Sequence, residues 1–472
     1  MIHITTAAIV DSVLVLLAIV AFLQWNKKEP THDYTAEFGE ESDHLSMFNK
    51  GVAVTGNKAI TKAQSCTNVA LFGPTGSGKS STVIISSVAS LARAKSSMVI
   101  NDVSGEVYDR TSAYLAKKGY KIMRLDFSNS LYSESFNPLL ECRSISDIQK
   151  VALLVVRNSI GESKGDPFWE QASIMLISLF IRYLVFHCTP EHKSMQNVLR
   201  LIEKFAADTT QAIDALFLAT NDEELISSYK ATLVMGEKTL QSVIATARTT
   251  LNIWNDKEVC RTTATNTIDF NLLRNEPVAL YVCNPLKDLV YFKPISALFF
   301  QSLFNYVLSR IPDKKERSIF FLLDEFAVYK FPNMNLVISN IRKMNAGILI
   351  CMQDEMALIS NYGQAEAHQI KTNCGCQIYL KGQPLHTCKE LSQILGKYTY
   401  TEENGSTKNR ELMTPDEIRM TDDAIILINN AAPLKCRPVP YYKNFWLKHL
   451  AKAKPLQLNS TNPVNPPLIP FE

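Results

Sequence analysis

The sequence has little net charge. Its 472 residues include 49 Lys and Arg and 46 Asp and Glu, which leaves a formal charge of +3. A protein that coats nucleic acid over its whole surface needs a large basic excess, so that class is excluded, whereas a local basic groove is compatible with the composition. At about 100–200 residues per domain, the length suits roughly two to four domains.

Cysteine and glycine are also scarce. The sequence has 10 Cys and 17 Gly, which excludes a disulfide scaffold and a collagen-like repeat. Cysteines such as Cys283 lie in apolar stretches, so we expect buried thiols in a reducing compartment. Cys374 and Cys376 form the one close pair, and because no second pair stands at zinc spacing, we do not expect a metal there.

Long hydrophobic runs are few, which excludes a polytopic membrane protein. Residues 7–25 form an apolar run that would span about 28 Å as a helix, close to the membrane core. No Lys or Arg precedes this run, and Lys27 and Lys28 follow it, which is the reverse of a cleaved signal peptide. The positive-inside rule then places the following chain in the cytoplasm. We predict a single membrane anchor over residues 1–27 with a very short outer tail; the alternative is a buried N-terminal helix.

A second apolar run, Ala172–Cys188, contains Arg182, which is costly in lipid. A crossing there would also place the two halves of the nucleotide site described below on opposite sides of the membrane. We therefore expect this run to be a core helix.

From residue 66 onward, short apolar runs alternate with stretches of helical periodicity. This pattern predicts an α/β fold with a parallel sheet covered by helices on both faces. The predicted strands are Asn68–Phe72, Ser97–Asn101, Lys121–Phe127, Val278–Cys283, Ser318–Leu323, Gly347–Met352 and Gln377–Leu380.

The pattern changes between about 160 and 265, where helical runs occur without clear strands. We expect an all-helical domain inserted into the α/β domain. The last residues, from Pro455, contain five prolines and predict a flexible tail. The predicted divisions are an anchor (1–27), a linker (28–65), a first nucleotide-binding part (66–159), the helical insertion (160–265), a second nucleotide-binding part (266–440) and a tail (441–472).

One motif predicts a phosphate-binding loop. Residues 73–80 match GxxxxGK[ST] in full and stand between a predicted strand and a helix, the setting that supports the motif. In such a loop, backbone N–H groups point at the phosphates at a helix N-terminus. Lys79 is expected to reach the β- and γ-phosphates, and the Ser80 hydroxyl to bind Mg²⁺. The expected nucleotide-binding residues are Gly73, Pro74, Thr75, Gly76, Ser77, Gly78, Lys79, Ser80 and Ser81.

An acidic pair follows another predicted strand, Ser318–Leu323. We expect Asp324 to hold Mg²⁺ and Glu325 to polarise the water that attacks the γ-phosphate. Without the phosphate loop, such a pair could simply mark a helix N-terminus. With it, the tandem acids favour hydrolysis over passive nucleotide binding.

Two further residues are candidates for linking hydrolysis to motion. Gln353 follows the strand Gly347–Met352 and could hydrogen-bond the γ-phosphate, or it could be an ordinary surface glutamine. Arg342 lies before that strand and could reach the site of a neighbouring subunit, or it could simply be solvated.

Taken together, these motifs resemble the type IV secretion coupling proteins, the TraG/TraD-like conjugative DNA-transfer ATPases. The resemblance covers about residues 65–440. It is carried by VINDVSGE (99–106), FNPL (136–139), Phe168-Trp169, LLDEF (322–326), Arg342-Lys343, Gly347, Gln353, Tyr362-Gly363, NCG (373–375) and LMTPDE (412–417). In the first of these, Val103 and Ser104 replace the family's Pro and Lys, so any role of that lysine is absent.

The resemblance implies a RecA-like nucleotide-binding domain with an inserted helical domain, anchored in the bacterial inner membrane with most of the chain cytoplasmic. It implies ATP and Mg²⁺ as cofactors, and homo-hexamers that bring DNA–relaxase complexes or protein effectors to a secretion channel. Family members commonly have two membrane helices around a periplasmic segment and a long C-terminal extension. We expect this chain to have a single helix and no such extension.

The leading functional hypothesis is therefore a membrane-anchored ATPase that couples a DNA substrate to a type IV secretion channel. A receptor for protein effectors and a non-motor docking module are the alternatives, and Glu325 argues against the second because docking needs no catalytic base. DNA contact would come from pore loops that grip single- or double-stranded DNA without reading its bases. Lys381, Arg261 and Lys371 are weak candidates for such contacts.

Overall fold

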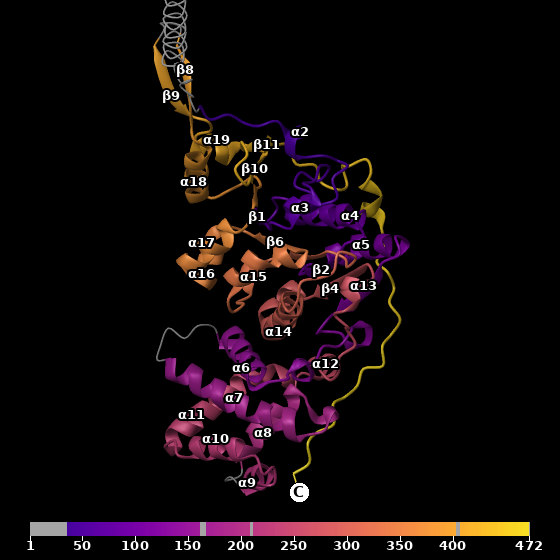
Figure 1. Cartoon of the computed structure of the whole chain (residues 1–472), viewed down its shortest axis with the longest axis vertical. Coiled ribbons are helices and arrows are strands. Elements are labelled where there is room, and N and C mark those ends of the chain that lie inside the picture. Colours follow the sequence, from indigo (N-terminus) through magenta and orange to yellow (C-terminus); the bar gives the residue numbers. More distant parts are fainter. Residues whose placement is uncertain (1–34, 161–166, 208–210, 403–405, 472) are drawn as a thin grey trace, which may run out of the picture.

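The computed structural model describes residues 35–160, 167–207, 211–402 and 406–471. The sheet and its covering helices occupy the upper and middle part of the molecule, and a helical region lies below them (Figure 1). The predicted membrane anchor, residues 1–27, lies outside the described residues.

One nine-stranded sheet organises the described chain, in the order β11-β10-β7-β1-β6-β5-β2-β4-β3. The strands from β7 to β3 are parallel, β10 pairs with β7 antiparallel, and β11 pairs with β10 antiparallel. A separate hairpin is formed by β8 and β9. The bounds are β1 Val69–Phe72, β2 Ser97–Asp102, β3 Lys121–Leu125, β4 Val278–Cys283, β5 Ile319–Leu323, β6 Ala346–Met352, β7 Cys376–Tyr379, β8 Lys397–Thr401, β9 Thr407–Glu411, β10 Ala424–Ile428 and β11 Leu434–Cys436.

Helices cover both faces of the sheet. On one face, Ile100 of β2 and Leu322 of β5 share an apolar cluster with Val88 of α4; on the other, Leu323 shares a cluster with Phe304 of α14. The helices are α2 Glu41–His44, α3 Lys62–Ser65, α4 Ile85–Ala92, α5 Glu106–Lys117, α6 Ile145–Ile160, α7 Pro167–His187, α8 Met195–Ala207, α9 Gln211–Leu218, α10 Glu223–Leu233, α11 Glu237–Leu251, α12 Lys257–Thr262, α13 Leu272–Asn275, α14 Leu289–Leu308, α15 Met334–Asn340, α16 Glu355–Tyr362, α17 Gln364–Thr372, α18 Leu385–Leu395 and α19 Pro415–Met420.

The predicted α/β fold is confirmed, and each of the seven predicted strands is present within one or two residues of its expected bounds. The hairpin β8–β9 and the strands β10 and β11 were not predicted. The hairpin strands are polar and mostly exposed, so they lack the apolar alternation that marks a half-buried strand. Strand β11 is only three residues long, too short to register as a pattern.

The region between β3 and β4 is helical in its described residues, from α6 to α12. Its longest helix, α7, is the one helix of the described chain whose length and apolarity would suit a membrane span. It packs against α6, α8, α10 and α11, and its Leu176, Phe180 and Leu184 are buried. Its Arg182 pairs with Asp222 at 3.0 Å. These contacts agree with the expected core helix, whereas the boundaries 160 and 265 stay predictions.

The expectation of a flexible tail is wrong for the described residues. Residues 453–471, here called the C-terminal strap, run as an extended chain along one side of the molecule towards the helical region (Figure 1). Near α5, the Leu456 N–H donates to Ser112 Oγ at 2.9 Å, and further on the Thr461 N–H donates to the Leu131 carbonyl at 2.7 Å.

The strap ends against α8. The Asn197 side chain donates to the Pro467 carbonyl at 2.9 Å and accepts from the Ile469 N–H at 3.0 Å, while Arg200 lies 5.0 Å from the centre of the Phe471 ring. Proline prevents regular secondary structure without preventing an extended segment from binding a surface. The proline-rich composition therefore agrees with the extended conformation of the strap, but it does not predict that the strap packs against α8.

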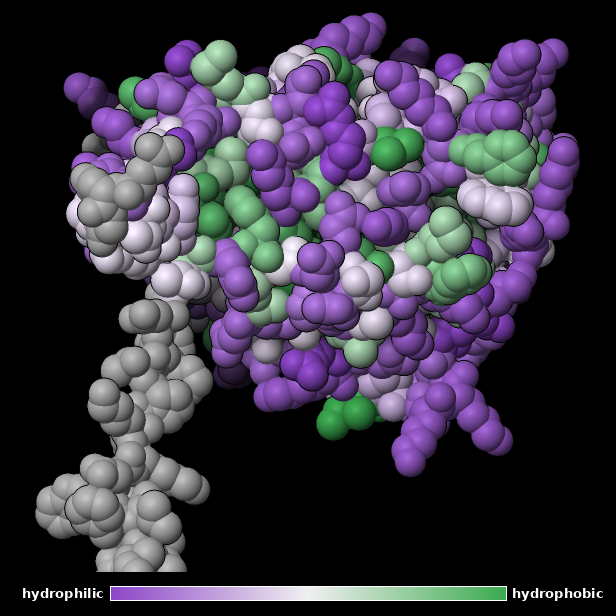
Figure 2. All heavy atoms as spheres, turned by 90° about the horizontal axis from the view of Figure 1, so that it is seen from above, coloured by the Kyte–Doolittle hydropathy of each residue, from purple (hydrophilic) through white to green (hydrophobic). Residues whose placement is uncertain are grey.

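The face seen from above is mostly hydrophilic, with hydrophobic side chains exposed in several separate patches (Figure 2).

Candidate nucleotide site

The predicted phosphate loop connects β1 to the helix that continues into α4. Its first residue, Gly73, donates its N–H to the Met352 carbonyl of β6 at 3.1 Å, which ties the loop to the sheet. Gly76 and Gly78 have φ of 81° and 94°, a left-handed conformation that favours glycine. Helical hydrogen bonding begins at Lys79, so the loop closes at a helix N-terminus. This geometry suits an anion held by backbone N–H groups.

Lys79 lies inside this loop. Its buried ammonium donates to the Gly73 carbonyl at 2.7 Å and stands 3.8 Å from Glu325 Oε1. The ion pair joins the phosphate loop to the acidic pair that follows β5. The structure therefore brings together two predicted motifs that lie more than two hundred residues apart in the sequence.

The acidic pair is buried unevenly. Burial raises the pKa of Asp324 to about 7; the Glu325 carboxylate adds to this rise, and Lys79 opposes it. Glu325 is less buried and has φ of 50°, an uncommon conformation for a non-glycine residue. A carboxyl group whose charge is penalised by burial gains most from a nearby cation, which agrees with the predicted Mg²⁺ role of Asp324.

A third carboxylate at this edge was not predicted as a site residue. Asp102 ends β2, the neighbour of β5, and accepts the Tyr108 N–H at 2.7 Å. Burial raises the pKa of Asp102 to about 6, and this carboxylate in turn raises the pKa of Asp324. The signal was present in the VINDVSGE motif, but that motif gave Asp102 no role.

The other predicted residues divide between the two ends of the sheet. Gln353 follows Met352, which pairs with Phe72 directly before the phosphate loop, so Gln353 lies at the same edge as Lys79. Ser80 and Ser81 open the following helix, and the Ser81 carbonyl accepts the Tyr441 N–H at 2.9 Å.

Arg342 lies at the opposite, amino end of the sheet. It is exposed in the turn before β6 and is close enough to Cys66, which precedes β1, to oppose the burial that raises the pKa of that thiol. The structure therefore does not bring Arg342 to the phosphate loop of its own chain.

A cavity of about 320 Å³ borders the phosphate loop. It is lined by Pro74–Ser77 on one side and by Lys381, Gly382 and Arg419–Asp422 on the other. Lys381 pairs with Asp422 at 3.3 Å in the wall opposite the phosphate loop. Lys381 therefore lies beside the nucleotide site.

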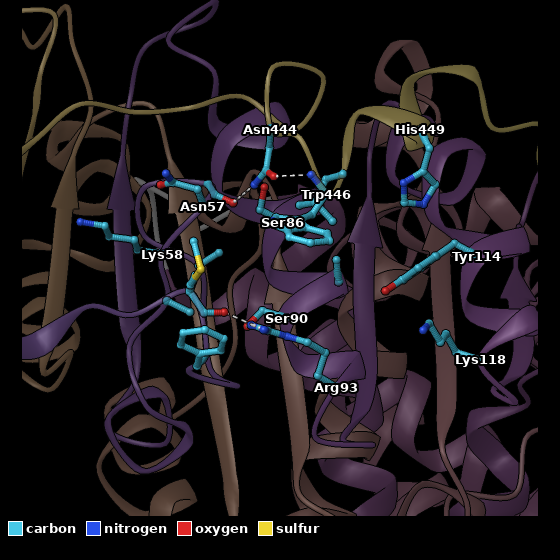
Figure 3. Close-up of a pocket in the computed structure, with 17 residues that line it drawn as sticks. Asn57, Lys58, Ser86, Ser90, Arg93, Tyr114, Lys118, Asn444, Trp446 and His449 are labelled. Atoms are coloured by element: carbon cyan, nitrogen blue, oxygen red, sulfur yellow. Dashed lines mark hydrogen bonds between the residues drawn. The ribbon is translucent and has the colours of Figure 1, made fainter. Parts of the chain in front are cut away.

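A second cavity, of about 440 Å³, lies away from the phosphate loop (Figure 3). Arg93, directly after α4, and Tyr114 of α5 line it together with Asn57, Trp446 and His449 from the segments that flank the sheet. No residue of 73–80 is among those that line it, so this cavity is separate from the nucleotide site.

Two of the weak DNA-contact candidates are engaged within the chain. Lys371 is only 5% exposed and is held by Glu355 at 2.5 Å and Glu390 at 2.6 Å, so its suggested DNA contact is wrong. Arg261 donates to Asn465 of the C-terminal strap at 2.8 Å and pairs with Glu258.

The described residues hold no group of three or more His, Cys, Asp or Glu side chains arranged for a metal ion. Cys374 and Cys376 are buried, and burial raises the pKa of both thiols. Both therefore fit the expected buried thiols.

The model of the family described as "Type IV secretory system Conjugative DNA transfer" matches residues 40–465. The chain is 24% identical over 419 residues to Protein VirD4 of Rhizobium radiobacter, covering 80% of this chain and 58% of that protein. It is 24% identical over 493 residues to Protein VirD4 of Rhizobium rhizogenes, covering 94% and 70%. The chain thus spans less than two thirds of the first of these relatives.

Solved structures share the fold. The bacterial conjugative coupling protein TrwBdeltaN70, in a trigonal form with sulphate, has a TM-score of 0.69 at 17% identity, covering 87% of this chain and 96% of that one. The plasmid coupling protein TrwB in complex with ADP and Mg²⁺ has a TM-score of 0.66 at 18% identity, covering 83% and 89%.

Proposed function

The chain belongs to the type IV secretory system conjugative DNA transfer family, and from this premise we propose that it is an ATP-hydrolysing coupling protein. It uses ATP to deliver a DNA–relaxase substrate to a type IV secretion channel. The observation that carries the proposal is the meeting of Lys79 with Glu325, at 3.8 Å, beside a buried Asp324. A protein that only bound nucleotide would need the loop and lysine but not the second acid.

The residues present fit a nucleotide with Mg²⁺. The loop offers backbone N–H groups at a helix N-terminus, and Ser80 and Asp324 supply the oxygen ligands that Mg²⁺ prefers. The cation would neutralise charge on the phosphates and on Asp324, whose pKa burial raises to about 7. TrwB structures hold ADP with Mg²⁺ and a non-hydrolysable ATP analogue, which supports the same ligands here.

In this proposal each residue has one task. Lys79 leaves the Gly73 carbonyl and Glu325 to bind the β- and γ-phosphates, and Glu325, released from that ion pair, orients and deprotonates the attacking water. Gln353 contacts the γ-phosphate from the neighbouring strand end. Because Arg342 lies at the other end of the sheet, it acts in the site of an adjacent subunit, which implies an assembly such as a homo-hexamer.

The sequence and the family support the proposed setting. Residues 1–27 anchor the chain in the bacterial inner membrane, with the bulk of the chain in the cytoplasm. A ring concentrates a few basic residues of each subunit around its pore, so a net charge of +3 is compatible with sequence-independent DNA binding there. Channel components and relaxase are the expected partners.

The first test is ATP turnover by the full-length chain with and without single- or double-stranded DNA. We expect DNA to stimulate turnover, and Lys79→Ala to abolish it while Lys50→Ala, which changes an exposed lysine, retains it. Turnover that ignores DNA would favour the receptor for protein effectors. Absence of turnover would favour the docking module, and substantial turnover in Lys79→Ala would refute the assigned site.

A further inference from the structure

The segment that follows the catalytic acids leads from the nucleotide site to the helical region. We call residues 326–331 the post-acid segment. The strand end before it is held from β2, because Asn101 Nδ2 donates to the Asp324 carbonyl at 2.6 Å. The same asparagine accepts from the Tyr329 hydroxyl at 3.1 Å, and that tyrosine is buried. One side chain of the sheet therefore holds both the catalytic strand end and the middle of the post-acid segment.

The far end of the segment is held by the helical region. Asn158, on α6 and only 4% exposed, donates from Nδ2 to the Lys330 carbonyl at 3.1 Å and accepts the Lys330 N–H at 3.2 Å. The amide thus pairs with both polar groups of one backbone residue. A shift of Lys330 must either carry Asn158 and α6 with it or break both hydrogen bonds.

A third contact comes from α16, the helix that follows Gln353. Asn361, near the end of α16, donates to the Ala327 carbonyl at 3.0 Å and to the Tyr329 carbonyl at 2.6 Å. The next residue, Tyr362, accepts the Phe331 N–H at 3.3 Å. Helix α16 begins two residues after Gln353, so the segment is held by the element that leads away from the γ-phosphate position.

These contacts satisfy backbone groups that a loop cannot satisfy by itself. Packing alone would need only apolar side chains, and Phe326, Tyr329 and Phe331 already supply them. The two asparagine amides add directional links to two different elements, α6 and α16. Movement at Glu325 or Gln353 therefore has a hydrogen-bonded route to the helical region.

We propose that the post-acid segment is a relay that transmits the state of the nucleotide site to the helical region through Asn158, with Asn361 linking the same segment to α16, the helix that follows Gln353. Asn158 is a positioning residue, since it acts on Glu325 through the segment. The relay rests on the proposed function, because it needs a nucleotide in the site.

Hydrogen exchange of the full-length chain, with and without adenylyl imidodiphosphate and Mg²⁺, tests the relay. In the wild-type chain we expect slower exchange at residues 73–84 and a changed exchange rate in α6, residues 145–159. In Asn158→Ala we expect the response at 73–84 to persist and the α6 response to fall by about threefold or more, the effect of losing two hydrogen bonds. Asn361→Ala removes the hydrogen bonds from α16 to the Ala327 and Tyr329 carbonyls and is expected to reduce the α6 response as well.

Asn335→Ala is the matched control. Asn335 lines the same cavity between α6 and α17 as Lys330, but its amide donates to Gln369 at 2.9 Å and not to the post-acid segment. We expect this variant to behave as wild type. Equal loss of the α6 response in Asn335→Ala would indicate general loosening and overturn the relay.

Kinetics give a second readout. Asn158→Ala should lower kcat by about threefold to tenfold and leave the KM for ATP within about twofold, because it disturbs the position of Glu325 and not the phosphate loop. Asn158→Asp keeps an acceptor for the Lys330 N–H but turns a carboxylate oxygen toward the Leu154 and Lys330 carbonyls, so it should lower kcat at least as far as Asn158→Ala. A wild-type α6 response and kcat in Asn158→Ala overturn the relay. Absence of protection at 73–84 in the wild-type chain overturns the proposed function itself.

Discussion

Both ends of the sheet bury ionisable side chains, but the neighbouring groups differ. The carboxyl end buries carboxyl groups close to one another, and the amino end buries an arginine among backbone carbonyls. At the carboxyl end, Asp102 and Asp324 end neighbouring strands, and burial raises the pKa of each, to about 6 and about 7. At the amino end, Arg274 is 4% exposed and donates to the Arg317 carbonyl at 2.8 Å and to the Met344 carbonyl at 2.7 Å. Buried carboxylates that repel one another mark a place for a cation, whereas an arginine enclosed by carbonyls fastens loops together.

The sharpest test of this contrast concerns the exposed arginine at the amino end. Arg342→Ala should lower turnover by about 10³-fold or more if Arg342 acts as a trans arginine, with no change in melting temperature. Lys343→Ala, an exposed neighbour, should leave turnover unchanged. Full turnover in Arg342→Ala would show that Arg342 has no role in hydrolysis.

Glu325→Gln tests the chemical role of the carboxyl end. We expect kcat to fall by about 10²–10³-fold, because the variant keeps the shape but loses the base, while nucleotide affinity is retained. Glu316→Gln is the control, since Glu316 stands at the other end of β5 and pairs with Arg310 at 2.5 Å. Near-normal kcat in Glu325→Gln would remove Glu325 from the mechanism.

The pH dependence of stability tests how strongly burial disfavours the ionised form of Asp324 at the carboxyl end. Since burial raises the pKa of Asp324 from 3.8 to about 7, the folded chain binds an extra proton between these values. Its stability relative to Asp324→Asn should therefore fall as pH rises from about 4 to 7 and level off above that. The full difference is roughly 4 kcal/mol, measured by urea unfolding without Mg²⁺ or nucleotide. A difference independent of pH would contradict the raised pKa.

Arg274→Met tests the structural role of the amino end. It leaves buried carbonyls without a donor, so the free energy of unfolding should fall by about 2–3 kcal/mol while the nucleotide site keeps its affinity. Arg310→Met removes a solvent-exposed partner of an ion pair nearby and should lower the free energy of unfolding much less. An equal fall in the free energy of unfolding for the two variants would show that the buried hydrogen bonds of Arg274 stabilise the fold no more than an exposed ion pair does.

Local patterns predicted most of the candidate nucleotide site. Residues 73–80 and the pair Asp324-Glu325 each carry their signal within a few neighbours, and the parallel strands are marked by continuous apolar runs. What failed depended on distant partners. The sequence around Lys371 does not indicate that this lysine pairs with Glu355 and Glu390. Asn158 likewise lies 172 residues from the Lys330 backbone to which it is hydrogen-bonded. The docking of the C-terminal strap was missed for the same reason.

The position of β1 has a consequence for how the protein folds. This strand lies between β6 and β7, and the Ile348 N–H donates to Asn68, the residue before β1, across 280 positions of sequence. Contacts so distant in sequence carry a large loop-closure cost and slow folding. On a ribosome adding about 5–20 residues per second, the phosphate loop would wait for tens of seconds for its neighbouring strands. The phosphate loop therefore cannot take its place in the sheet before β6 and β7 have been made.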